Sequence, residues 1–268
     1  PYGTGSKKVT TDAKVIKPGM IYVDLNEKST ESVYTAYNKG ANLIITQHNI
    51  SDSRLPVIKV NDIGSSYLKL LDILYGYPLK KVSFIPIYGG NRGNIVAKVL
   101  EQAFKKHFLK AKKCNDTIDF LAFTIPSKYN FYVEEFFYYV LNCIMRNNII
   151  IPIPYDENLS SLESIIRSNS ECEIIIECSS INAKNICGTK SGKIVLINID
   201  EPYALTMIRS NNDNVIITYG LSKRAAVTAT SIDYGEWTNF NYCLQRTLTS
   251  RTGAIIEPFE VPLSIKGL

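Results

Sequence analysis

Residues 83–104, SFIPIYGGNRGNIVAKVLEQAF, have the layout of a phosphate-binding loop. An apolar run from Val82 to Tyr88 leads into a glycine-rich turn, and an amphipathic stretch without a helix breaker follows. Backbone N–H groups at the start of a helix point towards bound anions, so this order of elements is typical of nucleotide sites. The lysine and the Ser or Thr that hold phosphates and magnesium in such loops are absent. The stretch is either a nucleotide site that has lost its chemistry or a tight turn.

Polar residues also stand where two later apolar runs end. Glu177 follows the run in EIIIEC, and Asn198 and Asp200 follow the run in VLINID. Parallel α/β folds place functional groups at the carboxyl ends of their strands, but ordinary capping residues occur there as well. Glu177 is therefore either a functional carboxylate or a cap. Asn198 and Asp200 either contact a ligand or only shape the strand end.

The elements that must position these residues form two groups. The first closes near residue 80, and the second fills the rest of the chain. In order, the first has a strand at 20–25, a helix from 29 or 30 to Gly40, the strands ANLIIT and LPVIKV, and a helix ended by Gly76 and Pro78.

The second group alternates strands with helices before it ends in strands alone. In order, it has a strand at 82–88, a helix at 94–110, the strand TIDFLAFTIP, the helix YVEEFFYYVLNCIM, the strands NIIIPIP, ECEIIIECSS and GKIVLINIDE, a helix at 202–210, the strand NVIITYG, and antiparallel strands in AAVTATSID, WTNFNYCLQRTL and AIIEPFEVPL. Alternation of this kind implies a mostly parallel sheet covered on both faces. The sequence thus predicts an α/β protein with two domains, 1–80 and 81–268, the second ending in antiparallel strands.

Composition excludes several classes of protein. Six cysteines without a C-x-x-C pair argue against a zinc site and against a disulfide framework. The basic stretch FKKHFLKAKK at 104–113 is either a nucleic-acid contact or the solvated end of a helix. No basic strand is interleaved with aromatic residues, so we expect no nucleic-acid partner. No apolar run reaches the roughly 18 residues of a membrane span, and the N-terminal stretch lacks a signal-peptide core, which favours the cytoplasm.

Several short stretches keep a common order and spacing over most of residues 9–232. They are DAKVIKPGMIYVDL, GANLIIT and LYGYP in the first domain, and EIIIECSS, LINIDEPYA and VIITYG in the second. Together they resemble the Mur ligases, above all the UDP-N-acetylmuramoyl-tripeptide synthetases, whose patterns include D-S-R-x-V-x-x-G-D-L-F-V-A, M-E-V-S-S and V-x-T-Y-G. The resemblance implies a UDP-sugar domain followed by an ATP domain. It also implies a cytoplasmic enzyme of peptidoglycan precursor synthesis that uses ATP and magnesium to make an acyl phosphate, which an amino acid then attacks.

The glycine-rich turn falls where these ligases have V-T-G-T-N-G-K-T-T. Gly89 takes the place of the first glycine and Asn91 that of the asparagine. Arg92, Gly93 and Asn94 replace the second glycine, the lysine and the first threonine. The lysine neutralises the β and γ phosphates and the threonine helps to hold magnesium, so the resemblance implies a degenerate ATP site.

The resemblance also implies roles for single residues elsewhere in the chain. Glu177 corresponds to a glutamate that faces magnesium, Ser179 and Ser180 to serines near substrate, and Asn198 and Asp200 to a pair that contacts adenosine. Thr124, in FTIP, corresponds to a threonine for the peptide substrate. Asp12 corresponds to an aspartate near the uridine diphosphate, where Lys14 replaces an arginine. The interval from Ser180 to Lys193 lacks the family's T-N-x-x-x-D-H-L-D motif and its magnesium-positioning lysine.

Three hypotheses follow for the function. The first is a ligase-inactive relative that binds a cell-wall precursor such as a UDP-N-acetylmuramoyl-peptide. The second is a genuine ATP-dependent amino-acid ligase with an atypical phosphate loop and a third domain outside this chain. The third is an assembly partner of a cell-wall enzyme.

Overall fold

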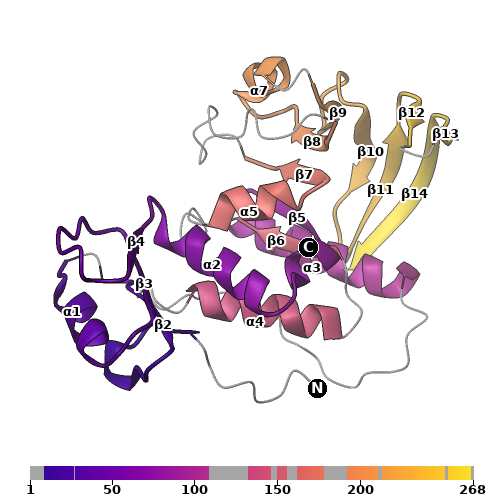
Figure 1. Ribbon diagram of the computed structural model, residues 1–268. Helices are drawn as coiled ribbons and strands as arrows, with labels where there is room; N and C mark the ends of the chain where they lie inside the picture. The colour runs from indigo at the N-terminus through magenta and orange to yellow at the C-terminus, as the bar shows by residue number, and fades with distance from the viewer. Residues whose placement is uncertain are drawn as a thin grey trace. The chain divides into compact units, whose positions relative to one another are not determined.

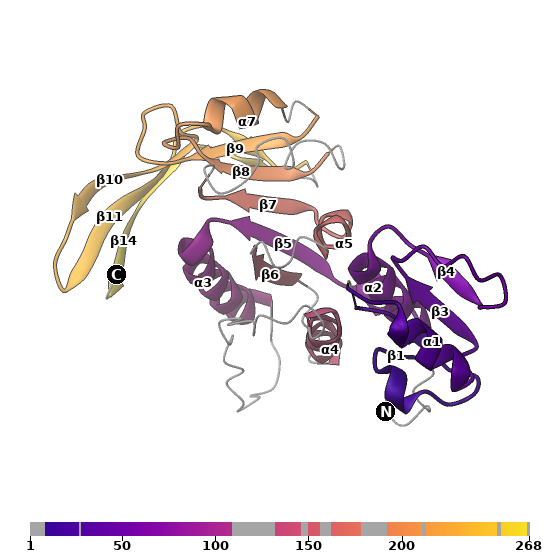
Figure 2. The same ribbon diagram turned by 90° about the vertical axis from the view of Figure 1, so that its left-hand side faces the viewer.

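The computed structural model describes residues 9–26, 28–108, 132–145, 150–155, 162–177, 192–210, 213–250 and 253–266; of residues 102, 104–108 and 132 only the backbone is described. The chain divides into two compact units, drawn in Figures 1 and 2. The first comprises 1–82, 121–149 and 158–165, and the second comprises 83–120, 150–157 and 166–268. The first unit therefore takes in two stretches that the sequence alone places in the second domain. The assignment of a UDP-sugar role to 1–80 and an ATP role to 81–268 stays a prediction.

The first unit contains a parallel four-stranded sheet in the order β1-β2-β3-β4. Its strands are β1 (Val9–Thr10), β2 (Ile21–Val23), β3 (Leu43–Thr46) and β4 (Val57–Lys59). The 3-10 helix η1 (Ala13–Val15) connects β1 to β2, and α1 (Glu31–Asn38) connects β2 to β3 (Figure 1). Because all four strands run the same way, the residues that follow them meet at one edge of the sheet.

The helices of the first unit begin and end close to where the sequence predicts. Ser29 accepts the N–H of Glu31, while Thr30, at the N-cap of α1, makes no side-chain capping bond. Asp62 caps α2 (Ile63–Leu74) by accepting the N–H of Ser65. Gly76 follows α2 with a φ of +76°, a conformation that favours glycine. The core under these elements is apolar and consists of Ala13, Ile16, Tyr22, Val33, Ala36, Ala41, Ile44 and Leu55.

Helix α4 (Tyr132–Met145) also belongs to the first unit, where it packs against α2 and η2 (Pro78–Lys81). Tyr67 on α2 donates a short hydrogen bond to Oε1 of Glu134 on α4. The rings of Tyr75 and Phe137 meet edge to face with centroids 5.2 Å apart. A polar and an aromatic contact therefore both join α2 and its flank to α4.

The second unit contains an eight-stranded sheet in the order β14-β11-β10-β9-β8-β7-β5-β6. Its strands are β5 (Ser83–Tyr88), β6 (Ile150–Pro154), β7 (Cys172–Ile175), β8 (Ile194–Asn198), β9 (Val215–Tyr219), β10 (Val227–Asp233), β11 (Trp237–Leu244) and β14 (Phe259–Lys266). Strands β5 to β10 pair in parallel, and β10, β11 and β14 pair antiparallel. Both views show these last three strands curving away from the parallel part (Figures 1 and 2). The mixed sheet confirms the predicted fold class; the predicted strand TIDFLAFTIP lies outside the described residues.

Among the described residues, three helices and a small hairpin complete the second unit. They are α3 (Gly90–Phe108), α5 (Glu163–Ser168), whose first residues count with the first unit, α7 (Ala204–Ser210), and the pair β12 (Leu248–Thr249) and β13 (Ile255–Ile256). Apolar side chains of β5, β7 and β8 fill its core, among them Ile87, Ile175 and Ile197. Helix α3 begins four residues before the predicted residue 94, because Gly90 adopts a φ of +50° and the helix starts directly at the strand end.

Within the part of the chain that the structure describes, no helix is both long and apolar enough to span a membrane.

Candidate functional site

The glycine-rich turn joins β5 to α3 without an open loop. The carbonyl of Gly89 accepts the backbone N–H groups of Arg92, at 3.0 Å, and Gly93, at 3.2 Å. Both N–H groups are thus used by the first helical turn. A Cβ on residue 89 would lie 2.7 Å from Cβ of Ile176, so only glycine allows the end of β5 to pack this closely on the end of β7. The sequence identifies the turn correctly, and its geometry is that of a tight strand-to-helix connection.

An ion pair links this turn to the residues that follow β7. Nε of Arg92 lies 3.3 Å from Oε1 of Glu177, which follows β7. Glu177 is brought there by its backbone N–H, which donates to the carbonyl of Tyr88. A Cβ on Gly90 would lie 3.8 Å from Oε2 of the same carboxylate. The fold therefore brings two predicted residues, Arg92 and Glu177, together, while Asn91 and Asn94 are exposed on the first turns of α3.

Asn198 and Asp200 also lie at this edge of the sheet, and the side chains of both form hydrogen bonds with backbone groups. The amide of Asn198 donates to the carbonyl of Ile176 at 3.3 Å and accepts the N–H of Asp200 at 3.1 Å. The carboxylate of Asp200 accepts the N–H groups of Leu221 and Ser222 in the loop after β9. These side chains tie together the ends of β7, β8 and β9. Thr124, Ser179 and Ser180 lie outside the described residues.

The predicted residues of the first unit follow β1. Asp12 accepts the N–H of Lys14 at 2.8 Å and so caps η1. The side chain of Lys14 is exposed, and its carbonyl accepts a short hydrogen bond from Nζ of Lys39. Asp12 therefore has a local structural role, and Lys14 is an exposed cation on η1, next to the C-terminal end of α1.

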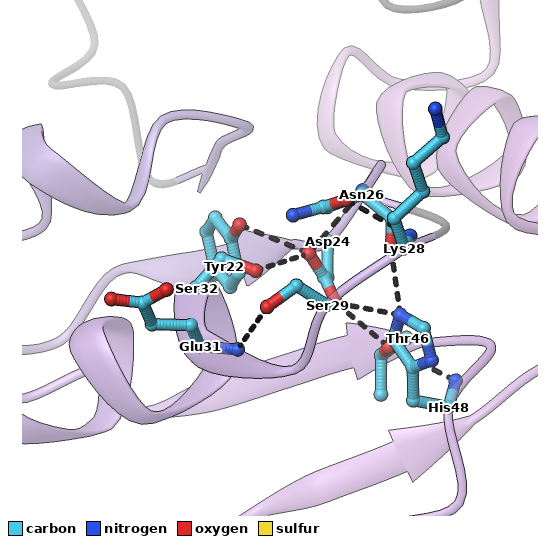
Figure 3. Close-up of polar contacts among 9 residues, drawn as sticks. All are labelled: Tyr22, Asp24, Asn26, Lys28, Ser29, Glu31, Ser32, Thr46 and His48. Atoms are coloured by element: carbon cyan, nitrogen blue, oxygen red, sulfur yellow. Dashed lines mark hydrogen bonds and ion pairs between the residues drawn. The ribbon is translucent and has the colours of Figure 1, made fainter.

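A second polar cluster at this edge was not among the predicted site residues (Figure 3). Asp24, after β2, is 2% exposed, and its Oδ1 accepts the hydroxyls of Tyr22, at 3.2 Å, and Ser32, at 2.8 Å. Its Oδ2 accepts the hydroxyl of Thr46 at 3.0 Å and lies 3.9 Å from Nε2 of His48. The sequence offered one signal for this cluster, a polar residue at the end of each of two buried strands, Asp24 at the end of β2 and Thr46 at the end of β3. The quoted family pattern has alanine where Asp24 stands.

Asp24 and His48 also line a hollow of about 210 Å³, together with Leu25, Asn26 and Gln47. Burial raises the pKa of Tyr22 to about 12, and the charges of Asp24 and Asp12 act in the same direction, against a hydrogen bond with Ser32. Tyr22 therefore stays a hydroxyl donor to Asp24 at neutral pH. Among the residues that the structure describes, no group of three or more His, Cys, Asp or Glu side chains is placed to hold a metal ion. The hollow is instead suited to hydrogen bonding with a small polar group.

Comparison with known proteins gives partial sequence matches. No family model matches the sequence. The UDP-N-acetylmuramoyl-L-alanyl-D-glutamate--2,6-diaminopimelate ligase of Phocaeicola vulgatus is 28% identical over 104 residues, which are 37% of this chain and 21% of that protein. The ligase of the same name from Lactiplantibacillus plantarum is 27% identical over 100 residues, 36% of this chain and 20% of that protein.

Solved structures match over nearly the whole chain. MurF from Acinetobacter baumannii superimposes with a TM-score of 0.53 at 11% identity, over 97% of this chain and 55% of that one. A UDP-N-acetylmuramoyl-L-alanyl-D-glutamate--2,6-diaminopimelate ligase superimposes with a TM-score of 0.58 at 16% identity, over 94% of this chain and 54% of that one. At these identities the superpositions show the fold, and the chain spans about half the length of the solved ligases. Sequence relatives and structural neighbours thus both point to the Mur ligase family, and over the part that they cover the chain is Mur-ligase-like.

Proposed function

We propose that this Mur-ligase-like chain binds a UDP-N-acetylmuramoyl precursor of peptidoglycan and does not itself form an amide bond with ATP. The observation that carries the proposal is the ion pair between Arg92 and Glu177. Glu177 is the carboxylate that the family resemblance assigns to magnesium, and here a guanidinium neutralises it. The site thus lacks an available negative charge where ligase chemistry would need one.

The donor set around the turn does not fit ATP and magnesium. Gly93 and Asn94 stand where the resemblance places a lysine and a threonine, so neither the phosphate cation nor the metal-binding hydroxyl is present. The N–H groups of Arg92 and Gly93 are bonded to Gly89, and the carboxylate of Asp200 is bonded to the loop after β9. We therefore derive no phosphoryl-transfer step through this site.

Features of the first unit support the proposal that the chain binds a UDP-N-acetylmuramoyl precursor. The curated relatives are named for acting on UDP-N-acetylmuramoyl substrates. In this chain the first unit offers an exposed cation at Lys14, on η1, and a polar hollow beside Asn26 and His48 where β2 and β3 end. A diphosphate held by one lysine and backbone donors binds weakly, and salt weakens the binding further.

Phosphate release tests whether the chain is a ligase. The purified protein is incubated with ATP, magnesium and UDP-N-acetylmuramoyl-dipeptide, and inorganic phosphate is measured with and without an added amino acid. We expect no release above the background without protein, because catalysis by such enzymes depends on positioning and on neutralising the phosphate charge. Magnesium-dependent release that requires the dipeptide substrate would overturn the proposal.

Thermal unfolding tests precursor binding. A ligand that binds only the folded state raises its melting temperature, and at equal concentration the ligand with the higher affinity raises it more, so UDP-N-acetylmuramoyl compounds should stabilise the chain more than ATP. Lys14→Ala should remove most of this stabilisation. Lys17→Ala is the matched control, since Lys17 is also exposed and lies close in the sequence. Equal protection by ATP, or no loss in Lys14→Ala, would contradict the assignment.

Two other functions make different predictions. A genuine ATP-dependent amino-acid ligase is favoured by the fold, which matches 55% of a solved MurF chain, and it requires phosphate release in the first test. If the chain is instead an assembly partner of a cell-wall enzyme, neither nucleotide should protect it against thermal unfolding.

We place the binding protein in the cytoplasm, where UDP-linked precursors are made.

A further inference from the structure

The link between α2 and η2 holds a tyrosine in an unfavourable backbone conformation. Gly76 and Tyr77 both have a positive φ, of +76° and +60°. Their N–H groups donate to the carbonyls of Ile73 and Asp72, so backbone hydrogen bonds close the end of the helix. Glycine adopts the left-handed region without strain, but a tyrosine does not, and a residue before a proline favours extended backbone. Tyr77 is therefore strained where a glycine would not be.

The ring of Tyr77 does little to stabilise the fold. It is 45% exposed. Among the residues that the structure describes, its charged or aromatic contact is with Lys80, whose Nζ lies 4.3 Å from the ring centroid. A cation over an exposed ring contributes weakly to stability. A strained residue that packing does not stabilise points to a function at that position.

Tyr77 belongs to an exposed apolar surface with basic residues around it. We call this surface the Tyr77 patch; it consists of Lys69, Ile73, Leu74, Tyr77, Lys80 and Lys81. Ile73 is 54% exposed and Leu74 is 40% exposed. The neighbouring carboxylate of Asp72 is half-buried and accepts the N–H of Leu79, so the exposed charges of the patch are those of its lysines. Exposed apolar side chains gathered in this way mark an interaction surface, and the lysines favour an acidic partner.

The second unit has an exposed apolar surface of the opposite charge. The apolar residues of β14 alternate along the strand and so share one face, and each is 40–43% exposed; they are Phe259, Val261, Leu263 and Ile265. Glu257 precedes the strand and Glu260 lies near its start, and both are exposed. Their carboxylates accept hydrogen bonds from neutral side chains, those of Thr247 and Asn241. With the exposed Arg246 counted, this end of β14 still has a net negative charge.

A partner of β14 has access to its face more than to its edge. Strand β14 is the last strand of the eight-stranded sheet, so one side of its backbone is open. Pro262 lies within the strand, opposite Asn241, and has no N–H to donate to a further strand. A proline on an open edge disfavours the addition of another strand. The apolar face, together with Glu257 and Glu260, is therefore the surface that can dock, and we call it the β14 surface.

We infer that the β14 surface of one copy of this chain docks on the Tyr77 patch of a second copy. Both surfaces are exposed and apolar, and the lysines of one are complementary in charge to Glu257 and Glu260 of the other. Tyr77 is the anchor of the contact, because its backbone already holds it in place and tyrosine is a frequent hot-spot residue. The two surfaces differ, so the contact is heterologous, and copies either close into a ring or join in a row.

Sedimentation velocity measures this self-association directly. The sedimentation coefficient of the chain should rise between about 1 and 500 μM, since a contact of small area gives micromolar affinity. Added salt should weaken the association, because the lysines and glutamates involved are exposed. A single species of monomer mass over the whole range would overturn the inference. The docking does not depend on precursor binding, so the phosphate-release and thermal-protection tests can fail while it holds.

Exchange of charges tests which two surfaces meet. Lys80→Glu and Glu257→Lys, made in separate chains, should each raise the dissociation constant of self-association about tenfold. A mixture of the two variants should associate again, because the unaltered patch of one chain meets the unaltered β14 surface of the other, and the two altered surfaces are also opposite in charge. Lys223→Glu, an exposed change on another loop, is the matched control and should leave the association unchanged. A mixture that associates no better than either variant alone would overturn the inference.

Tyr77→Asn separates a docking role from a structural one. Asparagine tolerates the left-handed region, so the melting temperature at about 1 μM, where the chain is monomeric, should stay the same or rise. Self-association should nevertheless weaken about tenfold. Tyr34→Asn is the matched control for association, because Tyr34 is 43% exposed on α1, outside the patch. A lower melting temperature of Tyr77→Asn would show that the ring stabilises the fold, and parental self-association would show that it anchors no contact; either result contradicts the assignment.

Discussion

Nε of Arg92 lies 3.3 Å from Oε1 of Glu177, so the first turn of α3 and the end of β7 are joined by an ion pair. The side chain of Arg92 is 65% exposed, and a pair this open contributes less than about 1 kcal/mol to stability. Its effect is therefore on the chemistry of the site. It occupies a carboxylate at the carboxyl edge of the sheet and puts a long side chain where the resemblance expects glycine.

Restoring the family residues in this turn tests how far the site has diverged. Arg92→Gly, Gly93→Lys and Asn94→Thr, made together, should give measurable ATP binding by calorimetry, because they free Glu177 and supply the missing cation and hydroxyl. A Cβ at position 93 would lie 3.3 Å from the carbonyl oxygen of Ile87, which a small shift relieves. Phosphate release should remain absent, since the magnesium-positioning segment is still missing. No gain in binding would show that the helix start at Gly90, and not the side chains, prevents it.

Gly220→Ala should destabilise the second unit. Gly220 has a φ of +148°, and an added Cβ would lie 2.5 Å from Oδ2 of Asp200, which is itself held by Leu221 and Ser222. We expect a loss of about 1–3 kcal/mol in urea unfolding. Gly192→Ala is the control for the dihedral alone, because Gly192 has a φ of +82° and open space at its Cβ. Equal losses in both variants would mean that the contact with Asp200 contributes nothing.

Lys193→Met should be among the most destabilising single changes in the second unit. Nζ of Lys193 lies 2.7 Å from Oε1 of Glu173, and Nε of Arg167 lies 3.4 Å from the same oxygen; all three residues are buried. Removing the lysine takes away the shorter of these two contacts and the donor to the carbonyl of Arg167, and removing one partner of a buried ion pair costs about 3–5 kcal/mol. The exposed Lys223→Met provides the comparison, and denaturant unfolding measures both. A loss below about 1 kcal/mol would contradict the assigned role.

Tyr67→Phe should weaken the contact between α2 and α4. The Tyr67 hydroxyl donates to Glu134, and burial together with this bond raises the pKa of Tyr67 well above its usual range. Loss of a hydrogen bond to a charged group costs about 1.5–3 kcal/mol. Hydrogen exchange should show the amides of α4 less protected, while those of β5 to β9 stay unchanged. The exposed Tyr34→Phe serves as the control.

Stability should fall in alkaline solution for a reason that involves Tyr22. Its pKa rises to about 12 in the folded chain, chiefly through burial, against about 10 in an unfolded one. The folded state therefore keeps a proton that the unfolded state has lost, so this contribution is complete below about pH 10 and is lost as the pH rises to about 12. Tyr22→Phe should make the fall in unfolding free energy over this interval shallower. The same slope in both proteins would argue against a titrating Tyr22.

The sequence by itself determined the local elements and the class of fold. Apolar periodicity predicted the parallel strands and most helices, because burial on one or both faces is recorded in a few neighbouring residues. Gly76 marked a helix end through its backbone conformation, which is also local. The start of α3 was predicted four residues late because the whole glycine-rich turn was placed before the helix. Gly90, with a φ of +50°, instead lets the helix begin at the strand end.

Only the tertiary structure decided which of the polar strand ends meet. Asp24 and Thr46 are 22 residues apart, and Asp200 and Leu221 are 21 apart, yet each pair is hydrogen-bonded because neighbouring parallel strands bring their carboxyl ends to one edge. The same sheet order, with β7 beside β5, is what places Glu177 against Arg92. Strand order depends on how distant apolar faces are buried together, and no local pattern records it. For that reason the candidate residues could be read from the sequence, while their partners could not.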